Sequence, residues 1–191
     1  MTLEALLTLI SGVLVESRIP YMLTGSLAAA YHGAPRATQD IDLVVDASVD
    51  SLLAAAKALR DAGLYVSDDA IREAASASGM FNAIDPTSGW KIDFIVKKRR
   101  PFSVDEFNRR RDIEFMGLTL SIAQAEDVIL AKLEWAKLAD SERQLRDIAE
   151  ILNVQGSAVD RARIERWAND LNVAEQWQKA QDLGRAGRES V

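Results

Sequence analysis

Two acidic residues interrupt an apolar stretch near the start of the chain, where Asp40 and Asp42 stand one residue apart ahead of a Leu-Val-Val run. This alternation predicts a β-strand, in which successive side chains point to opposite faces. Asp40 and Asp42 therefore share one face, and the intervening Ile41 lies on the other. Like charges at this spacing repel each other, so the two carboxylates must either reach water or share a cation.

The rest of the chain alternates short strands with helices as far as residue 120 and is helical beyond it. Strands are expected at 21–24, 40–45, 64–67, 80–84 and 90–96, with a further pair around Gly117. Helices are expected at 3–17, 27–32, 49–62, 69–77 and 104–110, and again from Ala125 onward. The pattern predicts an α/β (α+β) fold, in which helices flank a mixed sheet and a helical C-terminal part follows.

The change from a mixed to a helical pattern divides the chain into three predicted parts. A core domain covers residues 1–120, a helical subdomain covers 121–185, and a flexible tail covers 186–191, where the apolar periodicity has stopped. Within the helical subdomain, Ser141 and Gln144 have the spacing of a capping box, in which each side chain bonds a free backbone N–H of the first turn. A helix is therefore predicted to begin there.

Composition and charge exclude several classes of protein. Apolar residues make up 48% and charged residues 27%, as in soluble globular domains, and no apolar run approaches the roughly 20 residues of a membrane helix. No secretory signal is expected, and the lack of cysteine excludes disulfides and thiolate chemistry; both favour a cytoplasmic protein. The net charge of −6 excludes a general nucleic-acid coat, which would be basic.

The charge is nevertheless uneven along the chain. Between Lys91 and Arg111 there are eight lysines and arginines against three acids, in a protein that is otherwise acidic. Such a basic segment can contact the phosphates of a nucleic acid, or it can be no more than a solvated strand end. Both interpretations are open at the level of the sequence.

Two further features accompany the paired acids. Gly25 and Ser26 separate a short strand from a short helix, and the start of a helix offers unpaired N–H groups and a positive dipole end to a phosphate. Asp93 lies between Ile92 and Phe94 on a later strand, so it points away from the core that these two residues join. If the two acidic strands are neighbours, their three carboxylates converge.

Three carboxylates beside a phosphate cradle suit phosphoryl transfer assisted by divalent metal. Mg²⁺ or Mn²⁺ takes oxygen ligands and bridges phosphate oxygens. Two such ions roughly 3.5–4 Å apart stabilise the attacking and the leaving oxygen of an in-line displacement. The expected cofactor is therefore Mg²⁺ or Mn²⁺, and the metal would lie between Asp40 and Asp42 and offset their repulsion.

These residues resemble a known family. The segment of residues 23–45 resembles the core of the nucleotidyltransferase superfamily, the polymerase-beta-like fold. Within that superfamily it resembles the AbiEii/MenT-type toxins and their uncharacterised relatives. The positions that carry this resemblance are Gly25, Ser26, Arg36, Thr38, Asp40 and Asp42. A lysine and an aspartate in two later helices fit the same family, at Lys132 and Asp147. The likeness covers about residues 1–153 and makes residues 1–120 a catalytic core.

For the acids, the resemblance implies direct roles in catalysis. Asp40 and Asp42 would ligate metal, and Asp93 would ligate metal or act as the general base. A simpler alternative exists for the first pair, because two acids on one strand can be a solvated edge pair with no function.

For the nucleotide, the resemblance implies a second group of residues, which are Gly25, Ser26, Arg36, Thr38, Lys132 and Asp147. The first two would hold the triphosphate. Lys132 and Asp147 would be catalytic: Lys132 would contact a phosphate or the nucleotide, and Asp147 would orient the nucleotide or touch its base or the metal. Each assignment has a structural alternative. Arg36 and Thr38 can simply fix a loop, Lys132 can be a surface lysine with a buried stem, and Asp147 can pair with the adjacent Arg146.

The expected function is therefore transfer of a nucleoside monophosphate from an NTP to an acceptor hydroxyl. RNA or tRNA is the candidate acceptor, in a toxin–antitoxin or phage-defence setting with a cognate antitoxin protein as partner. Two alternatives stay open. One is a small-molecule nucleotidyltransferase of the aminoglycoside-modifying type, and the other is a catalytically silent module of the same fold that only binds. The three intact acids argue against the second alternative.

Overall fold

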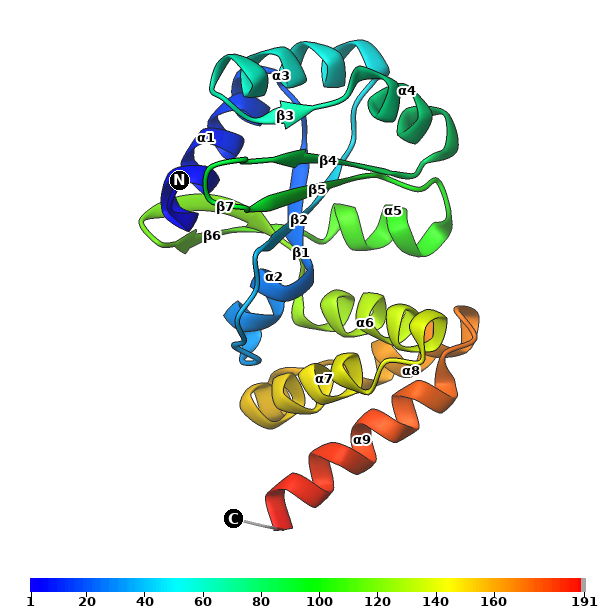
Figure 1. Ribbon diagram of the computed structural model, residues 1–191. Helices are drawn as coiled ribbons and strands as arrows, with labels where there is room; N and C mark the ends of the chain where they lie inside the picture. Colours follow the sequence, from blue (N-terminus) through cyan, green and yellow to red (C-terminus); the bar gives the residue numbers. More distant parts are fainter. Residues whose placement is uncertain (190–191) are drawn as a thin grey trace. The chain divides into compact units, whose positions relative to one another are not determined.

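The computed structural model describes residues 1–189 (Figure 1). Its backbone contacts divide the chain into two compact units. Unit 1 comprises residues 1–24 and 38–122, and unit 2 comprises residues 25–37 and the chain from 123 onward. The chain thus passes from unit 1 into unit 2 at residue 25 and back into unit 1 at residue 38.

Unit 1 contains a mixed β-sheet, which has seven strands within the described residues. Its order is β3-β4-β5-β2-β1-β7-β6. The strands are β1 (Tyr21–Thr24), β2 (Asp40–Val45), β3 (Tyr65–Val66), β4 (Met80–Ile84), β5 (Lys91–Val96), β6 (Arg111–Phe115) and β7 (Leu118–Ile122). β2 runs parallel to β5 and β1 parallel to β7, and the other neighbours are antiparallel. The predicted α/β fold with a mixed sheet and flanking helices is confirmed.

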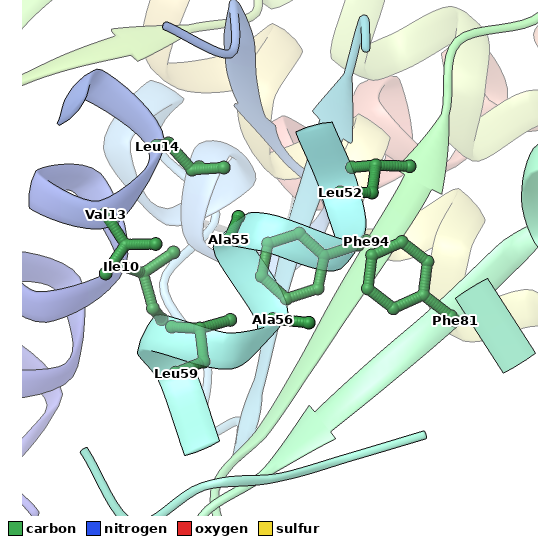
Figure 2. A pocket seen from close by; sticks show the side chains of 9 residues that line it. All are labelled: Ile10, Val13, Leu14, Leu52, Ala55, Ala56, Leu59, Phe81 and Phe94. Carbon is green, nitrogen blue, oxygen red and sulfur yellow. The ribbon is translucent and has the colours of Figure 1, made fainter. Parts of the chain in front are cut away.

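Four helices complete unit 1 among the described residues: α1 (Leu3–Glu16), α3 (Val49–Asp61), α4 (Asp68–Ala77) and α5 (Pro101–Asn108). α1 and α3 begin at Thr2 and Ser48, whose hydroxyls accept a hydrogen bond from a first-turn N–H. Both helices pack on the stacked rings of Phe81 and Phe94, whose centroids are 5.0 Å apart (Figure 2). The unfilled space among these side chains is only about 10 Å³ and is lined by apolar atoms, so it suits no ordered water.

This packing fixes which face of the sheet is the core face. Phe94 is 2% exposed and points toward α1 and α3 (Figure 2). Because neighbouring residues of a strand point to opposite faces, Asp93 lies on the other side of the sheet. The burial of β4 follows the same alternation, with Phe81 and Ala83 buried and Met80 and Asn82 exposed. The far face of unit 1 is therefore the one that can carry chemistry.

Unit 2 is helical in its described part. It contains α2 (Gly25–His32), α6 (Ala125–Ala139), α7 (Glu142–Gln155), a 3₁₀ turn (Gly156–Ala158), α8 (Arg161–Asp170) and α9 (Ala174–Glu189). The His32 ring donates a hydrogen bond of 2.8 Å to the Ala123 carbonyl, which ties α2 to the start of α6. A buried ion pair of 2.6 Å between Arg163 and Asp127 joins α8 to α6. These polar contacts fix α2 and α8 against α6.

The predicted tail over residues 186–191 is only partly covered by these elements. The backbone of residues 186–189 continues α9, and residues 190–191 lie outside the described residues. Its flexibility stays a prediction, as do the boundaries at 120 and 185. Within residues 1–189, no helix is both long enough and apolar enough to cross a membrane.

Candidate active site

The parallel pairing of β2 with β5 aligns the predicted acids of unit 1. Asp42 is the register partner of Asp93, and Asp40 is the partner of Lys91. Residues directly across a strand pair project from the same face. The three carboxylates therefore lie on one face of the sheet, opposite the core, as the strand patterns predicted.

Lys91 lies among these acids as an internal cation. Its Nζ is 2.9 Å from Oδ2 of Asp93 and 3.4 Å from Oδ1 of Asp40. The hydrogen bond to Asp93 raises the pKa of the Lys91 ammonium above its ordinary value, against the opposing effect of burial, and the charge of Asp40 raises the pKa further. Lys91 thus bridges Asp40 and Asp93, and its positive charge reduces the repulsion between these two acids.

Asp93 is only 5% exposed, and its two oxygens are in different situations. Oδ2 bonds to Lys91, whereas Oδ1 is buried and has no hydrogen-bond partner among the described residues. A buried carboxylate oxygen without a partner is unfavourable by about 1–3 kcal/mol or more. Such an atom in a native structure calls for a metal, a proton donor or a substrate group that binds there.

The donor set suits a divalent ion, although the acids are not gathered around one. Across residues 1–189, no cluster of three or more acidic or histidine side chains has the closeness that a metal ion needs. The unpartnered Oδ1 of Asp93, the aligned Asp42 and the carboxylate of Asp40 nevertheless supply the hard oxygen donors that Mg²⁺ and Mn²⁺ prefer. The types of ligand therefore suit the predicted metal, but the side chains do not form a metal site as they stand, and Lys91 lies among them.

Thr38 precedes this strand and fixes its first residue. Its Oγ1 accepts a 3.0 Å hydrogen bond from the backbone N–H of Asp40, and it lies 3.3 Å from the carbonyl oxygen of the same residue. This short loop contact orients the backbone from which the Asp40 carboxylate extends. The contacts of Thr38 agree with its alternative role of fixing the loop.

The other predicted residues lie together in unit 2, around Asp147. Arg36 donates from Nε to Oδ2 of Asp147 at 3.1 Å, and its Nη2 donates to the hydroxyl of Ser26 in the first turn of α2. Gly25, at the start of this helix, has a φ of 63°, a backbone conformation that glycine adopts without strain. The start of α2 is therefore held by a buried charge network.

Lys132 completes this network from α6. Its Nζ donates to Oδ2 of Asp147 at 2.7 Å and to Oε1 of Gln144 at 2.9 Å. Lys132 is 4% exposed, so it is not a surface lysine. Asp147 does not pair with its neighbour Arg146. The Nη2 of Arg146 instead lies 3.8 Å from Oε2 of Glu142, on the exposed side of α7.

One predicted contact of unit 2 is wrong. Ser141 does precede α7, but its side chain makes no capping hydrogen bond. Gln144 does not reach back to complete a capping box; its amide oxygen accepts from Lys132 instead. A buried ammonium needs an acceptor more than an exposed N–H does, since the N–H can bond to water.

Much of the basic segment is occupied by contacts within unit 1. Lys97 pairs with Asp46, Arg100 donates to the Ser103 hydroxyl at 3.0 Å, and Arg110 donates to the Phe107 carbonyl at 2.6 Å. Lys97 and Arg110 also lie over the Phe107 ring. Lys98 and Arg99 are exposed. The segment thus has structural roles and retains some charge facing solvent.

Three residues of these clusters were not expected from the sequence: Lys91, Gln144 and Asn82. Lys91 could have been found, because it stands two residues before Asp93 on the same strand and so shares its face. Asn82 is the register partner of Asp93 across β4 and β5, which only the hairpin register shows. Gln144 had a competing local explanation as part of a capping box.

The whole chain was compared with known proteins. No family model matches it, and no curated protein matches it. Solved structures do resemble it. The aminoglycoside-bound ANT(2")-Ia, in complex with adenylyl-2"-tobramycin, has 14% identity and a TM-score of 0.60 over 90% of this chain and 98% of its own.

Two other structures are similar to a comparable degree. The lincosamide antibiotic adenylyltransferase LnuA, bound to lincomycin, has 12% identity and a TM-score of 0.55 over 81% of this chain and 98% of its own. A nucleotidyltransferase-like antigenic protein from Paracoccidioides brasiliensis has 14% identity and a TM-score of 0.53, with 90% of each chain covered. The chain therefore has a nucleotidyltransferase fold, and the likeness to AbiEii/MenT-type toxins stays a prediction.

Proposed function

We propose that this protein is a metal-dependent nucleotidyltransferase, which transfers a nucleoside monophosphate from an NTP to an acceptor hydroxyl and releases pyrophosphate. One observation carries the proposal. We call the face of the unit 1 sheet opposite its core the open face. On this face Asp42 and Asp93 are register partners, and a buried oxygen of Asp93 has no hydrogen-bond partner among the described residues. A module that only binds has no need of this arrangement.

Unit 1 would carry the acid chemistry. Asp40 and Asp42 would hold Mg²⁺ or Mn²⁺, which when bound would neutralise charge on the phosphates. Asp93, whose Oδ2 is held by Lys91, would take the proton of the acceptor hydroxyl on Oδ1. The acceptor oxygen then forms a bond to the α-phosphorus, the bond from that phosphorus to the bridging oxygen breaks, and pyrophosphate leaves.

Unit 2 would bind the triphosphate. Gly25 and Ser26 present first-turn N–H groups of α2, and Arg36 holds the Ser26 hydroxyl. Lys132 and Arg36 both bond to Oδ2 of Asp147, so two cations lie close together. Paired cations of this kind suit a bound phosphate. Asp147 would then orient the two cations toward the nucleotide.

For the acceptor, we propose RNA or tRNA in a cytoplasmic toxin–antitoxin or phage-defence setting, with a cognate antitoxin as partner. The sequence resemblance and the exposed Lys98 and Arg99 support this acceptor. A small-molecule acceptor is the second candidate. It is favoured by the internal contacts that occupy Lys97, Arg100 and Arg110, since side chains so occupied contribute less to a phosphate-binding surface.

A transfer assay tests the proposal. The purified protein is incubated with α-labelled NTPs, Mg²⁺ and either total bacterial tRNA or tobramycin, the antibiotic of the similar ANT(2")-Ia complex. We expect Mg²⁺-dependent labelling of one acceptor, weakened by salt if that acceptor is tRNA. NTP binding without labelling of either acceptor would overturn catalysis and leave a binding module.

A further inference from the structure

One row of polar side chains crosses three strands on the open face of unit 1. Asn82 on β4 is the register partner of Asp93 on β5, and Asp93 is in turn the partner of Asp42 on β2. Partners in a ladder project from the same face and lie about 5 Å apart. Asp93 therefore has a carboxylate on one flank and a neutral amide on the other.

The two flanks differ in charge and in exposure. The β2 flank carries Asp42 and Asp40, where a metal and its phosphates would bind on the proposed function. The β4 flank carries no charge, and Asn82 is exposed there with Met80, which is 50% exposed. Further out, Tyr65 of β3 is 63% exposed and is the partner of Ile84 on the same face. An acceptor that reaches Asp93 without crossing the anionic flank must therefore pass over β4.

The Asn82 amide is available for a ligand. Within the part of the chain that the structure describes, its side chain makes no hydrogen bond, whereas the Oδ1 of the adjacent Asp93 is buried without a partner. Asparagine is disfavoured in strands, so the fold alone does not explain its presence at this exposed position between two apolar neighbours. An amide offers two N–H donors and one carbonyl acceptor in a fixed plane.

We propose that Asn82 positions the acceptor hydroxyl against Asp93 and so selects the acceptor. This inference rests on the proposed function and deepens it. The amide N–H₂ donates to the oxygen that attacks, or the amide carbonyl accepts from a neighbouring hydroxyl of the same acceptor. In either case the O–H bond that breaks points toward Oδ1 of Asp93, and the oxygen keeps its lone pair for phosphorus.

The acceptor chemistry follows from the surroundings of Asn82. The amide is neutral, and the exposed neighbours Met80 and Tyr65 are apolar or aromatic. A hydroxylated ring fits these groups, because its hydroxyls bond to the amide while its face lies on Tyr65 or Ile84. Both the terminal nucleoside of tRNA and a ring of tobramycin have this chemistry, and the two arms of the transfer assay distinguish them.

The experiment compares Asn82→Leu, which keeps the size and removes the hydrogen bonds, with Asn169→Leu, the same change at an exposed asparagine of α8, as a control. Steady-state labelling is measured with tRNA or tobramycin, whichever the wild type labels. We expect kcat/KM for the acceptor to fall at least about tenfold in Asn82→Leu, mainly through KM. The KM for NTP, the Mg²⁺ dependence and the melting temperature should not change, and Asn169→Leu should behave like the wild type.

Two results would overturn the role of Asn82 without touching the proposed function. One is a kcat/KM for the acceptor within twofold of the wild type. The other is a rise in the KM for NTP, which would place Asn82 with the nucleotide. If the wild type labels neither acceptor, or if Asp42→Asn labels as well as the wild type, the proposed function itself fails and the inference fails with it.

Discussion

The two compact units arrange their charged side chains in opposite proportions. On the open face of unit 1, the carboxylates of Asp40 and Asp93 share one lysine, and the pair Lys91–Asp40 is partly exposed, with 39% and 51% of the two side chains accessible. In unit 2, two cations share one carboxylate, and the pair Lys132–Asp147 is nearly buried, at 5% and 7%. Carboxylates attract a metal ion, and cations attract phosphate. We therefore expect metal binding to depend on the acids of unit 1 and phosphate binding on the cations of unit 2.

The largest effect is expected from removing a carboxylate of unit 1. Asp42→Asn should lower transfer by at least about a thousandfold, because the metal that supplies several kcal/mol of transition-state stabilisation loses a ligand. The fold should persist, since Asp42 lies on the face opposite the core. The labelling assay and the melting temperature measure the two quantities. Transfer within tenfold of the wild type would show that Asp42 is no ligand.

Removing the buried lysine of unit 2 should weaken both stability and NTP binding. Lys132→Met leaves Asp147 with Arg36 as its remaining cation and leaves Gln144 without its donor, so the free energy of unfolding should fall by about 3 kcal/mol. NTP affinity should fall about tenfold or more. Urea unfolding and calorimetric titration with ATP give these values. An unchanged ATP affinity in a folded variant would remove Lys132 from the phosphate site.

The matched lysine of unit 1 should behave in the opposite way. Lys91→Gln should lower stability by less than about 1 kcal/mol, because the pair is partly exposed. Mg²⁺ should then stabilise the variant more than it stabilises the wild type, since Asp40 and Asp93 have lost the cation that they share. Thermal melts with and without Mg²⁺ test this. Equal Mg²⁺-induced shifts in both proteins would mean that the ion does not bind among these acids.

The smallest expected effect is a pH dependence of the same lysine. The pKa of Lys91 is raised in the folded protein, chiefly by its hydrogen bond to Asp93. Its contribution is therefore fully present below the ordinary lysine pKa of about 10.4 and is lost as the pH rises through the folded value. The stability difference between wild type and Lys91→Gln should be constant from about pH 6 to pH 9 and should shrink above that. A difference that vanishes near neutral pH would contradict this assignment.

Whether a feature could be predicted from the sequence depended on how far apart in the chain the interacting residues lie. Strand alternation is local, so the common face of Asp40 and Asp42 could be read directly from the residues. The approach of Asp93 depends on β5 pairing with β2, which is decided by residues 51 positions apart in the chain. For unit 2, only the resemblance pointed to Lys132 and Asp147, because a lysine on a helix with an apolar stripe has no signal that it is buried.

Local patterns also failed where a distant partner competed. Ser141 and Gln144 match a capping box, yet Gln144 turns to the buried ammonium of Lys132. The basic segment indicated a phosphate-binding surface. In the structure, however, Lys97 pairs with Asp46, and Arg110 donates to the Phe107 carbonyl and lies over the Phe107 ring. In both cases a tertiary contact outweighed a preference that the sequence shows in isolation.

The division of roles between the units is tested most directly by binding alone, with no acceptor present. Mn²⁺ binding, followed by its electron paramagnetic resonance signal, and metal-free ATP binding, followed by calorimetry, are measured for Asp42→Asn and Lys132→Met. The account predicts that Asp42→Asn loses Mn²⁺ binding and keeps ATP binding, while Lys132→Met keeps Mn²⁺ binding and loses ATP affinity. The reverse pattern, or equal losses of both ligands in both variants, would contradict it.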